Sequence, residues 1–186
     1  MPTTVDCPIA TQCPASLMGC GPARCRWRPA ERASPPPGLQ LSYCEKDGDL
    51  LTCPGTDSMA IAMNRNFRIE SGFGKLFKEK FGCVNELKLQ GKGVGDVALL
   101  LKDGRYIYYM ITRGTFQFKP RYEDVGMCLR AVRQHCIDND VQSLAMPSRI
   151  GTGRDRLDWE IISSLIRGIF LDSNVQITIY CLGAEG

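Results

Sequence analysis

Apolar residues follow two different spacings along most of the chain, and the two spacings alternate. From Leu41 onward, short runs rich in β-branched and aromatic residues are separated by longer segments whose apolar residues recur at helical spacing. This alternation is typical of an α/β layered domain. It predicts strands over 41–45, 57–63, 96–102, 105–112, 141–146 and 175–181, and helices over 74–80, 83–90, 122–138 and 158–171.

Two neighbouring apolar runs indicate how the sheet is built. Lys102-Asp103-Gly104-Arg105 lies between them, and Asp-Gly is a favoured centre for a two-residue hairpin turn, so these strands should be antiparallel. The run from Tyr106 to Ile111 is apolar or aromatic at almost every position, as expected for a strand that is covered on both faces. The sequence therefore predicts a mixed sheet.

The first 40 residues differ from the rest in composition. Eight of the eleven prolines lie there, and because proline removes amide donors and fixes φ, we expect residues 1–40 to form a flexible tail. Residues 41–182 should form one domain, followed by a short tail over 183–186. Four arginines of the N-terminal tail leave two alternatives open, contact with acidic partners such as RNA and mitochondrial targeting, although the prolines oppose the amphipathic helix that targeting needs. These arginines are Arg24, Arg26, Arg28 and Arg32.

Length and charge exclude several classes of protein. The chain has 186 residues, enough for one domain with a proper core, and no apolar run approaches the roughly 20 residues that cross a bilayer. A net charge of +3 from 23 basic and 20 acidic residues is too small and too mixed to indicate a nucleic-acid partner. We expect a soluble monomer without membrane or nucleic-acid partners, in which any anionic ligand is held by local geometry.

The single histidine and the ten cysteines give little support for metal or nucleophilic chemistry. His135 alone cannot form a two-histidine zinc site, and its place in a predicted amphipathic helix favours a half-buried helix residue over a partner of a catalytic Ser or Cys. Without a signal peptide, reduced thiols and an intracellular location, nuclear or cytoplasmic, are expected. We expect no metal and no cofactor. A zinc cluster remains an alternative for the first four cysteines, although their spacing fits no common ligand pattern. They are Cys7, Cys13, Cys20 and Cys25.

Three segments at predicted strand ends carry candidate chemistry, because open α/β sheets bind their ligands there. In the first, Gly48-Asp49-Leu50, the carboxylate could accept a hydrogen bond from an exocyclic amine, or the pair Gly-Asp could be an ordinary turn. The second, Glu70-Ser71-Gly72-Phe73-Gly74-Lys75, leads into a helix. Its glycines and the unpaired amides of the helix start could cradle a phosphate, although it lacks the Lys-Ser/Thr of a Walker loop.

The third segment follows the apolar strand that ends at Met146. It runs from Arg149 to Trp159 and again places glycines before a helix, for which Asp158 is a good N-cap. Two such loops facing each other would suit a diphosphate. Asp155 could act as a base or orient a water, or it could simply pair with a neighbouring arginine.

Residues 41–182 resemble a macrodomain, most closely the terminal ADP-ribose protein glycohydrolase branch, whose members remove ADP-ribose from acidic side chains. The resemblance implies a three-layer α/β/α sandwich with a mixed, roughly six-stranded central sheet, across whose strand ends ADP-ribose lies. The motifs that carry it are Gly48-Asp49-Leu50, Cys53-Pro54, Thr56-Asp57-Ser58, Lys80-Phe81-Gly82, 103–109, Lys119-Pro120, Met146-Pro147, Arg149-Ile150-Gly151, Asp155-Arg156-Leu157 and Trp159-Glu160.

The resemblance also implies which residues bind ADP-ribose. Asp49 would bind the adenine amine with Leu50 beside it, and the two loops would hold the diphosphate and the distal ribose. The loop residues are Asn64, Ser71, Gly72, Phe73 and Gly74 in the first and Ile150, Gly151, Thr152, Gly153 and Arg154 in the second. The first loop has two alignments: without a gap Glu70 stands where the family has a glycine, and with a two-residue gap Gly72 and Gly74 stand there instead.

The catalytic match is incomplete. Enzymes of this branch use a lysine at the end of the Tyr-Tyr strand to form a covalent adduct with the ribose, assisted by an aspartate that corresponds to Asp155. Arg113 stands at the lysine position, and a guanidinium stays protonated and cannot supply a neutral amine. Two hypotheses follow. One is a weak or redirected hydrolase in which Asp155 activates a water, and the other is a silent reader of mono-ADP-ribosylated proteins.

Overall fold

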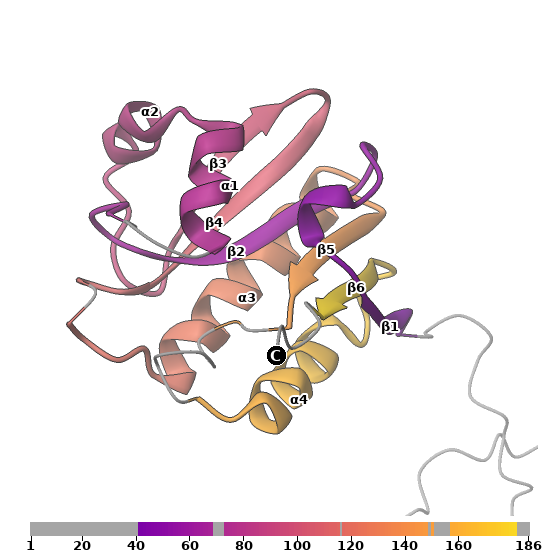
Figure 1. Ribbon diagram of the computed structural model, residues 1–186. Coiled ribbons are helices and arrows are strands. Elements are labelled where there is room, and N and C mark those ends of the chain that lie inside the picture. Colours follow the sequence, from indigo (N-terminus) through magenta and orange to yellow (C-terminus); the bar gives the residue numbers. More distant parts are fainter. Residues whose placement is uncertain (1–40, 69–72, 116, 149, 151–156, 182–186) are drawn as a thin grey trace, which may run out of the picture. The chain divides into compact units, whose positions relative to one another are not determined.

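The computed structural model describes residues 41–68, 73–115, 117–148, 150 and 157–181. Their strands form a six-stranded sheet with the order β1-β6-β5-β2-β4-β3 (Figure 1). The strands are β1 (Tyr43–Asp47), β2 (Ser58–Asn64), β3 (Val97–Lys102), β4 (Arg105–Arg113), β5 (Ser143–Pro147) and β6 (Gln176–Cys181). The helices are α1 (Phe73–Phe81), α2 (Val84–Leu89), α3 (Tyr122–Asp138) and α4 (Trp159–Phe170), with the short 3-10 helix η1 (Leu50–Thr52).

The sheet is mixed, as predicted. All of its pairings are parallel except that between β3 and β4, which is antiparallel. The turn between these two strands consists of Asp103 (φ 53°) and Gly104 (φ 77°), and two residues with positive φ are what a type I′ hairpin requires. Every predicted strand and helix is present, with boundaries within two residues of the prediction. Among the elements of the described residues, the sequence pattern missed only η1, which is too short to show a periodicity.

Helices cover both faces of the sheet, so the three-layer α/β/α architecture is confirmed. Figure 1 shows α1 and α2 on one face and α3 and α4 on the other. Tyr108 and Tyr109 illustrate why the central strand is apolar throughout: successive side chains of a strand point to opposite faces. Tyr108 joins the core under α3 and α4, and Tyr109 joins the core under α1. Both are fully buried.

The edge strand β3 is covered by a side chain. The amide of Gln90, just after α2, donates from Nε2 to the carbonyl of Leu99 at 2.6 Å, and its Oε1 accepts from the Leu99 amide at 2.9 Å. The side chain thus takes the place of a neighbouring strand. At the opposite edge, β1 exposes Glu45, Lys46 and Asp47, and charges of this kind discourage pairing with another chain.

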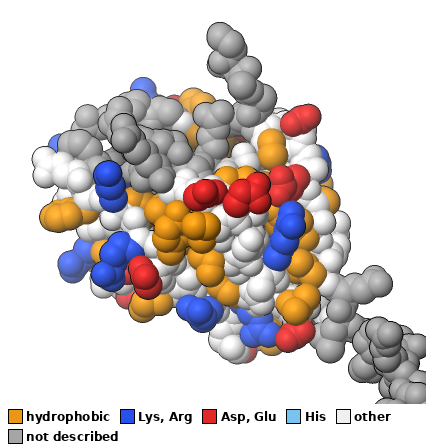
Figure 2. Space-filling model, turned by 90° about the horizontal axis from the view of Figure 1, so that it is seen from below, with side chains coloured by type: hydrophobic (Ala, Val, Ile, Leu, Met, Phe, Trp, Pro, Cys, Tyr) orange, Lys and Arg blue, Asp and Glu red, His pale blue; other side chains and the backbone are white. Residues whose placement is uncertain are grey.

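Three further expectations concern the surface charge, the absence of membrane-spanning helices and the two tails of the chain. The face in Figure 2 carries basic, acidic and apolar side chains. Within the described part of the chain, no helix is both long and apolar enough to cross a membrane. The predicted tails, 1–40 and 183–186, lie outside the described residues.

Candidate functional site

Four of the described candidate residues lie in a row where the parallel strands of the sheet end. Parallel strands end at the same edge, and Asp49 follows β1, Ile150 follows β5, Asn64 ends β2 and Arg113 ends β4. Four strand spacings of about 4.8 Å separate β1 from β4, so the row is about 19 Å long. Its order in space is Asp49, Ile150, Asn64, Arg113, which differs from the order in the sequence.

Asp49 owes its place to the residue before it. Gly48 has a φ of 149°, which favours glycine, and its amide donates to the Cys181 carbonyl at 2.9 Å. The chain then turns into η1, whose N-cap is Asp49: Oδ1 accepts from the Leu51 amide at 2.9 Å. A carboxylate has more lone pairs than one amide uses, so half-buried Asp49 can also accept a hydrogen bond from a ligand.

Leu50 anchors η1 to the core. Its side chain is only 1% exposed and packs in the same cluster as Phe77 and Phe81 of α1. Leu50 therefore offers a ligand its backbone more than its side chain. Its proposed place beside a bound adenine stays a prediction.

Asn64 and Arg113 are neighbours at the ends of β2 and β4. A register shift after Met63 pairs Asn64 with Arg113, and the Arg65 amide donates to the Arg113 carbonyl at 2.9 Å. Asn64 is 2% exposed, and its side-chain amide bonds to the backbone of Arg68. Asn64 thus fixes the turn from Asn64 to Arg68, and the half-buried Arg113 lies beside Asn64.

Of the first glycine segment, Phe73 and Gly74 are described, whereas Glu70, Ser71 and Gly72 lie outside the described residues, as does the choice between the two alignments. Phe73 and Gly74 form the first turn of α1, and both are half-buried. No acidic residue occupies this turn, so the helix's own side chains do not offset the positive end of its dipole there. The start of α1 is therefore suited to an anion.

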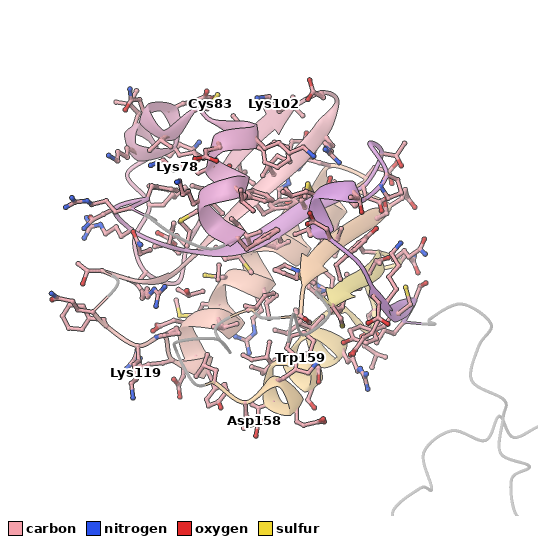
Figure 3. All side chains as sticks on the ribbon, viewed as in Figure 1. Lys78, Cys83, Lys102, Lys119, Asp158 and Trp159 are labelled. Carbon is pink, nitrogen blue, oxygen red and sulfur yellow. The ribbon has the colours of Figure 1, made fainter. Side chains whose placement is uncertain are left out.

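The second glycine segment is described only at its two ends. Ile150 is 1% exposed and belongs to the core under α3 and α4. At the other end, Asp158 caps α4 as predicted, with Oδ1 accepting from the Glu160 amide at 2.8 Å. The Tyr122 hydroxyl of α3 accepts from the Asp158 amide at 2.9 Å, a contact that the sequence did not suggest. Figure 3 labels Asp158 and Trp159 at the start of α4. Gly151, Thr152, Gly153, Arg154 and Asp155 lie outside the described residues.

His135 is a half-buried helix residue, as predicted. Its Nδ1 lies 3.0 Å from the Tyr108 hydroxyl, to which the Cys136 thiol donates at 3.4 Å, and burial lowers the pKa of His135. Burial also raises the pKa of Cys136 to about 11, so this cysteine is a thiol and a poor nucleophile. Tyr108 precedes Arg113 by five residues in β4, which places His135 away from the row of site residues.

Over the described ranges, no group of three or more His, Cys, Asp or Glu side chains is arranged to hold a metal ion. The described cysteines are unpaired thiols. Cys7, Cys13, Cys20 and Cys25, the candidates for a zinc cluster, lie outside the described residues.

Two basic residues that contact the segment between Asp49 and β2 were missed by the sequence analysis. Lys80 donates to the Leu51 carbonyl at 2.7 Å, and Arg105 donates to the Pro54 carbonyl at 3.1 Å. Both lie in motifs that carried the family resemblance, but nothing in the local pattern indicated that they would contact the segment after Asp49.

The fold recurs in solved macrodomain structures. The macrodomain of Mycobacterium tuberculosis DarG superposes with a TM-score of 0.67 at 18% identity, over 75% of this chain and 97% of that chain. The structure of Thermosipho africanus DarTG in complex with ADP-ribose gives a TM-score of 0.67 at 16% identity, over 80% of this chain and 44% of that chain. The fold is therefore that of a macrodomain.

Sequence comparison is more specific. Human ADP-ribose glycohydrolase OARD1 is 46% identical over 147 residues, which cover 79% of this chain and 95% of the human protein. The bovine protein of the same name is 45% identical over 145 residues, which cover 78% of this chain and 93% of its own. No protein-family model matches the chain. The chain belongs to the OARD1 family of ADP-ribose glycohydrolases within the macrodomains, which confirms the predicted branch.

Proposed function

We propose that this protein binds ADP-ribose along the row of groups at the carboxyl edge of the sheet. The observation that carries the proposal is the placement of Asp49 and Arg113 at opposite ends of this row, which is about 19 Å long. Helix α1 follows β2 in the chain, and its start is suited to an anion. Asp49 accepts a hydrogen bond from the adenine amine, the glycine segments hold the diphosphate, and the distal ribose lies near Arg113 and Asn64. Family membership supports this assignment.

We further propose that the protein hydrolyses ADP-ribose slowly from acidic side chains of mono-ADP-ribosylated proteins, or from O-acyl-ADP-ribose. Asp155 acts as the catalytic acid or base and activates a water, and Arg113 stabilises negative charge as the bond breaks. A covalent route through Arg113 is closed, because an arginine side chain does not supply the neutral amine that such an adduct needs.

A second candidate function is favoured by the same residue. If turnover is lost because Arg113 stands in place of the lysine, the proposed site still binds ADP-ribose, and the protein acts as a reader of mono-ADP-ribosylated proteins. The two functions share one binding site and differ only in whether the bond to the carrier protein is cleaved.

One experiment distinguishes the two. The full chain is incubated with a glutamate-linked mono-ADP-ribosylated protein, release of labelled ADP-ribose is followed with time, and the affinity for free ADP-ribose is measured by calorimetry in parallel. Binding with release supports the hydrolase, and binding without release supports the reader. Absence of binding contradicts both proposals.

We propose a cellular location and an assembly state from the cysteines and from the two edge strands. The described cysteines are unpaired thiols, which supports an intracellular location, nuclear or cytoplasmic. We also propose a monomer, since Gln90 and the charged residues of β1 cover or protect the two sheet edges. Light scattering on the purified chain tests the monomer, and fractionation of cells tests the location.

A further inference from the structure

Leu51 is held from two sides. Its amide donates to Oδ1 of Asp49 at 2.9 Å, and its carbonyl accepts from Nζ of Lys80 at 2.7 Å. Lys80 lies near the end of α1, 29 residues away in the sequence. The backbone of Leu51 therefore connects Lys80 of α1 to Asp49, which lies at the end of the proposed site that binds adenine.

The helix that contains Leu51 is too short to hold its own orientation. Within η1, the Thr52 amide donates to the Asp49 carbonyl at 2.9 Å and the Cys53 amide donates to the Leu50 carbonyl at 3.1 Å. One turn of helix gains few hydrogen bonds for the residues that it orders. Contacts from outside η1, namely the burial of Leu50 and the bond from Lys80, must therefore set its direction.

The rest of the loop is held by a second cation. Nη1 of Arg105 donates to the Pro54 carbonyl at 3.1 Å and also lies 3.4 Å from the Asp57 carbonyl. The cations of Lys80 and Arg105 lie 5.9 and 5.7 Å from the ring centroid of Phe81, within the range of cation–π attraction. The loop from Asp49 to β2 is thus held by hydrogen bonds from two cations, both of which lie near the buried ring of Phe81.

The end of α1 is itself fastened to the sheet, so Lys80 has a defined origin. Nζ of Lys102, the last residue of β3, donates to the Phe81 carbonyl at 3.0 Å. A cation at the last carbonyls of a helix is favourable. Figure 3 shows Lys102 at this end of α1, near Cys83.

We propose that Lys80 is a positioning residue that orients Asp49 and thereby sets a preference for adenine over bases without an exocyclic amine. The inference rests on the proposed function, in which Asp49 accepts a hydrogen bond from the adenine amine. Hypoxanthine carries an oxygen in place of that amine, so it cannot donate to the carboxylate. Without the hydrogen bond from Lys80 to Leu51, η1 becomes more mobile and Asp49 is oriented less well. The hydrogen bond from the adenine amine to Asp49 then contributes less to the affinity, while contacts to the diphosphate and the riboses are kept.

The test compares two ligands on the full chain. ADP-ribose and its hypoxanthine counterpart are titrated by calorimetry into the wild type, Lys80→Met and Lys80→Arg. We expect Lys80→Met to weaken the binding of ADP-ribose roughly three- to tenfold, as for the loss of one hydrogen bond, with little change in the binding of the hypoxanthine ligand. Lys80→Arg should keep most of the selectivity. In an Asp49→Ala background, Lys80→Met should cause no further loss, since the two residues act through one contact.

Lys78→Met is the matched control, because Lys78 lies on the same helix but lines a depression with Cys83 and Val84 at the start of α2 (Figure 3). Equal weakening of both ligands, unchanged selectivity in Lys80→Met, or additive losses with Asp49→Ala would each overturn the inference. A wild type that fails to bind ADP-ribose would instead contradict the proposed function. Melting curves verify folding, and Lys80→Gln replaces Lys80→Met if the latter does not fold.

Discussion

The side chain of Asn64 and the backbone of Arg68 form a closed ring of two hydrogen bonds. Nδ2 of Asn64 donates to the Arg68 carbonyl at 2.7 Å, and Oδ1 accepts from the Arg68 amide at 3.1 Å. Between them, Phe67 has a positive φ of 52°. The ring closes the turn that leads from β2 to the first glycine segment, beside Arg113.

Replacing Asn64 by alanine should therefore loosen this turn. Asn64→Ala removes both hydrogen bonds to the Arg68 backbone, and we expect the free energy of unfolding to fall by about 1–3 kcal/mol and ADP-ribose to bind more weakly. Urea unfolding and calorimetry measure the two effects. Asn85→Ala, at an exposed position of α2, is the control. Unchanged stability and affinity would show that the ring is dispensable.

Asp49→Ala should weaken ADP-ribose binding about ten- to hundredfold, since a hydrogen bond to a charged group contributes roughly 1.5–3 kcal/mol. We expect wild-type affinity in the micromolar range, measured by calorimetry. Asp49→Asn keeps an acceptor for the Leu51 amide and separates the loss of charge from the loss of the cap. Asp47→Ala, at the exposed end of β1, should bind like the wild type. Equal affinity in all variants would remove Asp49 from the site.

Arg113→Lys should restore covalent chemistry if the missing amine is what limits turnover. On this route the wild type is almost inactive on glutamate-linked ADP-ribose, and the variant gains measurable release. Mass spectrometry then detects a lysyl adduct of the ribose in the variant alone. A wild type that is as active as Arg113→Lys would argue against this route.

Asp155→Ala tests the alternative route through water. If Asp155 activates a water, the wild type already releases ADP-ribose, and Asp155→Ala should reduce release by roughly 10²–10⁴-fold, as is typical for loss of a general base. Arg113→Lys should then matter little. Robust wild-type hydrolysis that survives Asp155→Ala would contradict both routes and direct attention to Lys119.

Stability should fall in mild acid because of His135. Burial lowers the pKa of His135 in the folded state, with nearby Asp138 opposing, whereas the unfolded chain titrates near the ordinary value of about 6.5. Below that pH the unfolded state binds more protons, so the contribution is fully present at neutral pH and is lost as the pH falls through the folded pKa. Urea unfolding at several pH values measures the slope, and His135→Gln should reduce it. An identical slope in the variant would assign it to other groups.

Limited proteolysis should trim the chain near residue 40 and leave a folded core. The dense prolines and the lack of hydrophobic periodicity in residues 1–40 predict this result. Mass spectrometry identifies the cut, and elemental analysis measures zinc. A resistant N-terminus, or one zinc per chain, would instead support Cys7, Cys13, Cys20 and Cys25 as ligands.

Features that depend on neighbouring residues were predictable from the sequence. Over the described residues, the alternation of periodicities located the β-strands and α-helices, Asp103-Gly104 located the hairpin, and Asp158 located the start of α4. Each of these depends on φ, ψ preferences and on side chains within one or two turns of chain. The family motifs also brought Asp49, Asn64 and Arg113 forward as candidates before their arrangement was known.

What the sequence could not determine are the contacts between distant segments. The strand order places Ile150 between Asp49 and Asn64, Lys80 meets Leu51, and Tyr108 meets His135 only after the sheet and its helices have packed. Local pattern is silent on such pairs, since they depend on which strands become neighbours and which helix covers which face. The sequence by itself determined the elements and the candidate chemistry of this macrodomain. The tertiary structure decided the order of the candidate residues at the strand ends and the contact of Lys80 with Leu51 next to Asp49. Both arise from packing between segments that lie far apart in the chain.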